Sequence, residues 1–190
     1  MVEAATLFDF DRSKLALSYD VERLQQETLG AIQDLPPYIF YSVIPLTVAS
    51  GRNKEVSDYS NPDWAEWKET LLLKESPYFR EVLDTLQCRK TNVRLMRLGA
   101  GWDVQEHSDP QLNLEFRNQI RLHIPIFLND SVDFILNGTK VPLQPGELWY
   151  MRLSDPHSVH NNGETERIQL SIDVVVNEWV EEMIIGGERG

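Results

Sequence analysis

The four histidines of the chain all lie between residues 107 and 160, in its C-terminal half. His107 and Asp109 are separated by one residue, and in an extended segment such residues point to the same face, about 6.6 Å apart. An imidazole and a carboxylate placed in this way can bind one metal ion. A second histidine, His157 or His160, would complete three ligands on one side of the ion. This set of two histidines and one carboxylate leaves open positions and is typical of non-haem Fe(II) sites for oxygen chemistry.

Arg167 is a further residue whose type and position suggest a chemical role. It belongs to the run ERIQLSIDVVV, whose alternating apolar residues mark one face of a strand as core. An arginine that projects into the interior of a sandwich is costly unless it holds an anion. A guanidinium binds a carboxylate through two parallel hydrogen bonds, so a dicarboxylate cosubstrate is a natural partner.

The first half of the chain carries helical patterns. We predict a helix over residues 18–32, another over 64–73 and a third over 77–86, the last with proline in its first turn. Residues 38–49 are instead predicted to be an extended segment that enters or flanks a sheet.

From about residue 92 the apolar period changes from 3.6 to 2. The predicted strands cover residues 92–98, 120–128, 132–136, 147–153 and 166–176. Asn137-Gly138 is a strong two-residue hairpin signal, and Pro145-Gly146 marks another turn. We therefore predict a mainly β fold with N-terminal helices (α+β), a sandwich or jelly roll buttressed by helices.

Length and composition predict one soluble domain, because 190 residues with 42% hydrophobic content can bury a core. A net charge of -12 argues against binding to nucleic acid or to an anionic membrane. The single cysteine, Cys88, excludes an intramolecular disulfide framework. No secretory signal is visible, so we expect a cytoplasmic protein. The sequence leaves the oligomeric state open.

Five motifs follow one another in the C-terminal half: H-x-D, R-x-H, P-G-E-x-W, P-H-S-x-x-N and R-x-x-L-x-x-D, at residues 107–109, 121–123, 145–149, 156–161 and 167–173. In this order they resemble the aspartyl/asparaginyl β-hydroxylase superfamily with its bacterial proline-hydroxylase relatives. The resemblance covers about residues 92–177. It implies Fe(II)- and 2-oxoglutarate-dependent oxygenases on a double-stranded β-helix, the jelly-roll fold.

The resemblance implies one oxygenase domain over residues 1–190. Residues 1–90 would form a helical support region, 91–177 the jelly-roll core, and 178–190 a tail or short helix. The expected reaction uses O2 and 2-oxoglutarate to hydroxylate a C–H of an amino acid, an amino-acid derivative or an Asp, Asn or Pro residue, with succinate and CO2 as coproducts.

Carried over residue by residue, the resemblance makes His107, Asp109 and His157 the iron ligands. Strand parity separates His160 from His157, since an offset of three places the two on opposite faces. Arg167 would hold the distal carboxylate of 2-oxoglutarate.

Other motif residues would complete the site. Arg121 and His123 would help place the 1-carboxylate end of the cosubstrate, and Asp173 would be structural. The presence of Asp109 favours hydroxylation, because halogenating relatives have a small residue there.

The substrate is expected to be a small molecule or a peptide, with a small molecule favoured. Arg94 is a candidate for binding its carboxylate, against the alternative of a surface ion pair. Trp102 could form a wall of the pocket, and Arg117, in the connection 110–118, could meet an anionic substrate.

Two rival functions come from other classes. One is a cupin-type metal enzyme that uses no 2-oxoglutarate, which would leave Arg167 without a role. The other is a non-catalytic jelly-roll binding protein, in which the histidines only satisfy buried polar groups.

Overall fold

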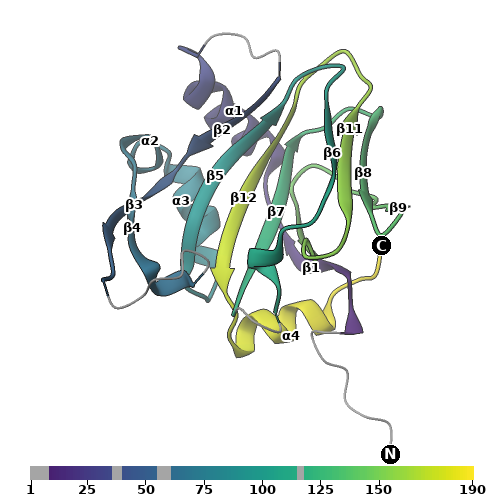
Figure 1. Cartoon of the computed structure of the whole chain (residues 1–190). Coiled ribbons are helices and arrows are strands. Elements are labelled where there is room, and N and C mark those ends of the chain that lie inside the picture. Colours follow the sequence, from purple (N-terminus) through teal and green to yellow (C-terminus); the bar gives the residue numbers. More distant parts are fainter. Residues whose placement is uncertain (1–8, 36–39, 55–60, 115–117) are drawn as a thin grey trace, which may run out of the picture.

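Two facing β-sheets dominate the structure, a computed structural model that describes residues 9–35, 40–54, 61–114 and 118–190 (Figure 1). The larger sheet has six strands, in the spatial order β1 (Arg12–Ser18), β10 (Glu147–Met151), β7 (Gln119–Phe127), β12 (Arg167–Val175), β5 (Lys90–Leu98) and β2 (Tyr41–Pro45). The smaller sheet has the order β6 (Asp103–His107), β11 (His157–Asn161), β8 (Val132–Leu136) and β9 (Thr139–Lys140). This arrangement is the predicted jelly roll.

Helices cover the face of the larger sheet that points away from the smaller one (Figure 1). They are α1 (Val21–Ile32), α2 (Leu71–Lys74), α3 (Pro77–Thr85) and α4 (Glu178–Gly186), with short 3-10 turns η2 (Pro62–Trp64) and η3 (Pro110–Leu112). None of the helices in the described part of the chain is long and apolar enough to cross a membrane.

Apolar residues form two separate cores. One lies between the helices and the larger sheet and includes Leu24 of α1, Phe79 of α3 and Leu170 of β12. The other lies between the two sheets and includes Phe134 and Trp149. The larger sheet is therefore covered on both faces, which is why β12 is buried along almost its whole length.

Polar caps define the ends of two helices. The Asp20 carboxylate accepts a hydrogen bond from the backbone N–H of Arg23 at 3.1 Å and so begins α1. The Glu27 carboxylate of α1 accepts from the backbone N–H groups of Tyr78 and Phe79, at 2.5 and 2.7 Å. Glu27 thus caps α3, and it joins the two helices.

Most of the predicted strands and turns are confirmed. The expected runs correspond to β5, β7, β8, β10 and β12, and the 18–32 and 77–86 helices correspond to α1 and α3. Asn137 and Gly138 both have positive φ, 51° and 73°, as the predicted hairpin requires. Gly146 also has positive φ, and a Cβ there would lie 2.6 Å from the Tyr19 carbonyl oxygen.

The helix predicted over 64–73 is wrong. Half of it is strand β4 (Ala65–Glu69), which pairs with β3 (Thr47–Arg52), and the short helix α2 begins only at Leu71. Pairing with β3 satisfies the backbone of this segment, so tertiary context overrides its local helical spacing. The first 90 residues also supply β1 and β2, both edge strands of the larger sheet, and are not simply helical. The extent of the oxygenase domain remains a prediction.

Candidate metal centre

His107 and His157 meet where the two strands that carry them pair in the smaller sheet. His107 ends β6, His157 begins β11, and the two are direct cross-strand partners with ring centroids 4.3 Å apart. Asp109 follows β6, where its backbone N–H donates to the carbonyl oxygen of Leu153 at 2.7 Å. One ligand atom from each of the three residues lies within 4.8 Å of the other two. The geometry thus gathers the predicted triad at one point.

Hydrogen bonds fix which nitrogen each imidazole can offer. Nδ1 of His107 lies 2.8 Å from the carbonyl oxygen of Gln105, and Nδ1 of His157 lies 2.9 Å from that of Asp155. A carbonyl oxygen only accepts, so each Nδ1 carries the proton and each Nε2 keeps its lone pair. Metal-binding histidines are commonly oriented by such a backbone bond. Burial also lowers the pKa of His157, which favours its neutral form.

The guanidinium of Arg121, on β7, links the carboxylates of Asp109 and Asp173. Its Nη1 donates to Asp109 Oδ2 at 2.9 Å, while its Nε and Nη2 donate to the two oxygens of Asp173, at 2.6 and 3.2 Å. Arg94 of β5 donates to Asp173 Oδ2 at 3.2 Å. Asp173 therefore pairs with two buried guanidiniums at once. Asp109 Oδ1 has no such bond to Arg121 and is left for another partner.

A cavity of about 260 Å³ opens between the two sheets beside the triad. The side chains that line it come from both sheets and from the connection after β6: Tyr41, Arg94, Met96, Val104, His107, Asp109, Gln111, Arg121, His123, Phe134, Leu153, His157, Val159, Arg167 and Gln169. The triad is among them, and so are the four other predicted site residues Arg94, Arg121, His123 and Arg167. Of the predicted site residues that the structure describes, all but Trp102 line this cavity.

Arg167 lies in this wall with only 3% of its surface exposed. Its Nη2 donates to Gln169 Oε1, and its Nε has no hydrogen-bond partner within the described part of the chain. Among the residues that the structure describes, no carboxylate pairs with it. Burial accordingly lowers the pKa of Arg167 to about 10. Such a group is costly to bury alone and is well suited to an anionic ligand.

His123 lies on the same inner face, two residues after Arg121. Burial lowers its pKa well below the ordinary value, and the charge of Arg121 acts in the same direction. The side chain of Gln169 opposes this shift, although neither ring nitrogen of His123 makes a well-aligned hydrogen bond to a described residue. His123 is therefore a neutral imidazole, which can donate or accept a hydrogen bond without adding charge to the cavity.

Trp102 and His160, both considered in the sequence, lie elsewhere. Trp102 is 40% exposed and packs edge-on against Phe40, with centroids 4.4 Å apart, outside the cavity lining. His160 points to the other face of β11, where its Nδ1 lies 3.2 Å from Asp103. Arg117 falls outside the described residues.

Sequence reasoning missed Tyr41, Met96, Phe134 and Gln169 as cavity residues. Tyr41 reaches the site because it is opposite Leu98, which is itself opposite Arg167 in the next strand. For Met96 and Gln169 a signal existed, since each lies two residues from a predicted site residue on the same strand face. Nothing in the sequence marked Tyr41 or Phe134.

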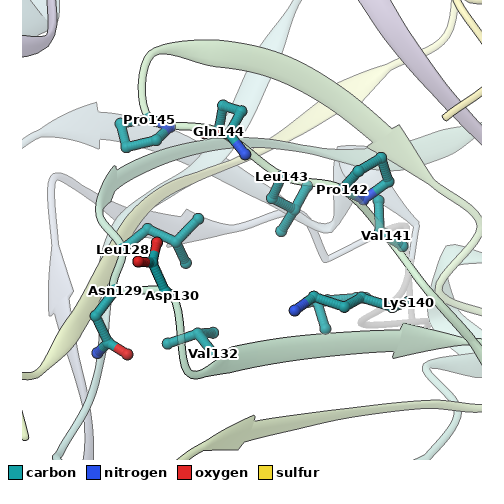
Figure 2. A pocket seen from close by; sticks show the side chains of 11 residues that line it. Leu128, Asn129, Asp130, Val132, Lys140, Val141, Pro142, Leu143, Gln144 and Pro145 are labelled. Carbon is teal, nitrogen blue, oxygen red and sulfur yellow. The ribbon is translucent and has the colours of Figure 1, made fainter. Parts of the chain in front are cut away.

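A second cavity, also of about 260 Å³, lies beside the β8–β9 hairpin (Figure 2). Its lining, within the described chain, includes no histidine, and its ionisable side chains are Asp130 and Lys140. Lys140 is already paired with Asp133 at 2.5 Å. The second cavity therefore lacks the donor set of the first.

Comparison with known proteins agrees with this geometry. The family model described as aspartyl/asparaginyl beta-hydroxylase matches residues 51–176, more than half of the chain. The chain belongs to this family. It is thus an enzyme of the oxygenase class, a hydroxylase, and the resemblance seen in the sequence motifs is confirmed.

Two solved structures share the fold. An oxidoreductase of the 2OG-Fe(II) oxygenase family from Burkholderia pseudomallei matches with a TM-score of 0.55 and 14% identity, over 83% of this chain and 79% of that one. The viral collagen prolyl hydroxylase of Paramecium Bursaria Chlorella virus-1, as its 2OG complex, matches with a TM-score of 0.51 and 12% identity, over 88% and 97%. At these identities the likeness confirms the jelly-roll fold.

Proposed function

We propose that this hydroxylase is an Fe(II)- and 2-oxoglutarate-dependent dioxygenase. It would convert a C–H bond of its substrate to C–OH, with 2-oxoglutarate and O2 consumed and succinate and CO2 released. The observation that carries the proposal is Arg167, a buried cation with no carboxylate partner in the described chain, in the wall of the same cavity as the triad. A dicarboxylate that binds the metal at one end can neutralise Arg167 with the other.

The residues of the cavity fit both groups. His107 and His157 would hold iron through Nε2 and Asp109 through its carboxylate, a donor set that suits Fe(II) with three open positions. Arg167 would hold the distal carboxylate of 2-oxoglutarate. The iron and the cosubstrate supply the oxidising power, whereas the chain supplies binding and orientation.

Arg121 and His123 would help place the 1-carboxylate end of the cosubstrate. Arg121 is suited to this because it already donates to Asp109, so it lies next to the metal ligands. Its bidentate contact with Asp173 fixes the guanidinium plane before any ligand binds. Neutral His123 would add a hydrogen bond without repelling iron.

The charges of the cavity indicate an anionic substrate. Three guanidiniums line the cavity, those of Arg94, Arg121 and Arg167, and the carboxylates of Asp109 and Asp173 offset two of their three charges. The double charges of Fe(II) and 2-oxoglutarate cancel each other, so one positive charge remains. Arg94 has only one contact with Asp173 and can turn its remaining donors to a substrate carboxylate. We therefore propose an amino acid, an amino-acid derivative, or an Asp, Asn or Pro residue near a carboxylate as substrate.

A screen for succinate release tests this proposal. Free amino acids and short acidic peptides would be compared with the same compounds whose carboxylates are amidated, each with iron, 2-oxoglutarate and O2. We expect at least one carboxylate compound to stimulate succinate release and to be hydroxylated in equal amount, while its amide is not. Equal stimulation by acid and amide would contradict the anionic substrate. An absence of 2-oxoglutarate turnover and binding altogether would contradict the dioxygenase.

A further inference from the structure

The inner face of β12 is polar along its length. Arg167, Gln169, Ser171 and Asp173 alternate along the strand, so all four point between the two sheets, and each is at most 4% exposed. A strand at the centre of a sheet normally has apolar residues on such a face, because buried polar groups need hydrogen-bond partners. Asp173 has its partners in two arginines. The end of the strand with Arg167 and Gln169 is less well satisfied.

The orientation of the Gln169 amide is determined by its neighbour. Gln169 Oε1 accepts a hydrogen bond from Arg167 Nη2. A guanidinium can only donate, so the oxygen of the amide must face Arg167 and the NH2 group must face the other way. There Nε2 lies 3.7 Å from the thioether sulfur of Met96, which is a weak acceptor, and the ring nitrogens of His123 make no hydrogen bond with it. The two N–H donors of Gln169 therefore lack a strong acceptor at the cavity wall.

Two donor groups of residues in the cavity wall thus lack good partners among the described residues: Nε of Arg167 and the NH2 group of Gln169. A carboxylate only accepts, and its two oxygens can receive hydrogen bonds from both groups. The oxygen of an amide or a hydroxyl could also accept these hydrogen bonds, but it carries no charge to offset the buried guanidinium. The pair is consequently selective for an anion.

We propose that Gln169 forms, with Arg167, a two-residue clamp for the distal carboxylate of the 2-oxo acid cosubstrate. Gln169 has two parts in it. Its carbonyl oxygen holds the guanidinium of Arg167 in orientation, and its NH2 group donates to the bound carboxylate. This inference rests on the proposed function, since that function supplies the dicarboxylate.

Binding of two 2-oxo acids to variants tests the clamp. 2-Oxoglutarate and 2-oxopentanoate have the same chain length and the same metal-binding end, but the second has a methyl group in place of the distal carboxylate. Each would be titrated into the anaerobic Fe(II) protein, with the visible charge-transfer absorbance giving Kd. The variants are Gln169→Leu, which removes the donor, and Gln169→Glu, which places a carboxylate against Arg167. Gln25→Leu is the matched control, because Gln25 donates to the Ile126 carbonyl oxygen away from the cavity.

We expect Gln169→Leu to raise the Kd of 2-oxoglutarate by about tenfold or more, the usual effect of losing a hydrogen bond to a charged group. The Kd of 2-oxopentanoate should change little. Gln169→Glu should lose more affinity for 2-oxoglutarate than Gln169→Leu, yet unfold at the same temperature as the parent or above it, because the introduced carboxylate would neutralise the buried guanidinium. Gln25→Leu should leave both Kd values unchanged.

The results separate this inference from the proposed function. If the parent protein gives no absorbance change with 2-oxoglutarate, the dioxygenase proposal fails. If the parent binds 2-oxoglutarate but Gln169→Leu binds it equally well, only the clamp is overturned. Equal weakening of both 2-oxo acids in Gln169→Leu would also overturn it, because the amide would then support the fold and not the distal carboxylate.

Discussion

Replacing Arg167 with methionine should make the ligand-free protein more stable and should weaken its binding of 2-oxoglutarate. The change removes a cation that is only 3% exposed and has no carboxylate partner in the described chain. Burying an unpaired ion costs several kcal/mol, whereas the unpaired Gln169 Oε1 left behind costs about 1–3 kcal/mol. The first effect is the larger one. We therefore expect the ligand-free Arg167→Met protein to be more stable by about 1–2 kcal/mol, which corresponds to a rise in Tm of about 2–8 °C.

The same variant should bind 2-oxoglutarate much more weakly. Two charge-assisted hydrogen bonds from one guanidinium contribute about 3–5 kcal/mol, so the Kd of 2-oxoglutarate should rise by about 10²–10⁴-fold. Thermal unfolding with and without 2-oxoglutarate measures both effects, since a ligand raises Tm only where it binds. Stabilisation by 2-oxoglutarate that is as large in Arg167→Met as in the parent would refute the reasoning. A large drop in ligand-free Tm would refute the claim that the guanidinium lacks a carboxylate partner.

Three further predictions concern other parts of the molecule. Asp109→Ala should lose Fe(II) binding as measured by metal analysis after desalting, whereas Asp103→Ala, at the surface beside His160, should retain it; equal metal content in the two would contradict the ligand assignment. Glu27→Ala should lower the free energy of unfolding by about 1–3 kcal/mol in urea titrations, because two N–H groups at the start of α3 lose their acceptor; an unchanged midpoint would show that water replaces it. Burial raises the pKa of Cys88 to about 11, so alkylation at pH 8 followed by mass spectrometry should be at least about 100-fold slower than for an unperturbed thiol, and a rate typical of free cysteine would contradict this.

The site was more readable in the sequence than the fold around it. The triad, Arg121, His123 and Arg167 could be named in advance because ordered motifs carry their spacing, and the structure gathers all of them, together with Arg94, around one cavity. Whether each has the role assigned to it remains a prediction. Tyr41 could not be named, because it reaches the cavity only through the pairing of β2 with β5, a contact between residues far apart in the chain.

Strand β12 shows why pattern alone falls short. Its alternation of polar and apolar residues is the pattern of a strand with one face in water. In the structure both faces are buried, and the polar face that includes Gln169 and Ser171 lines or underlies the interior between the sheets. Whether a face of β12 meets solvent depends on what the second sheet and the helices cover, so the pattern within the strand could not reveal that both faces are buried. The incorrect helix prediction over 64–73 has a similar cause. This segment is a strand because it pairs with β3, and the spacing of apolar residues within 64–73 carries no information about that partner.

The central claim is a His107, Asp109 and His157 iron site that takes 2-oxoglutarate. Anaerobic addition of Fe(II) and then 2-oxoglutarate, followed by visible absorbance, tests it most directly, with His157→Ala and His160→Ala as a matched pair. We expect a weak charge-transfer band in the parent and in His160→Ala, and no band in His157→Ala. Absence of the band from the parent, or its persistence in His157→Ala, would contradict the account.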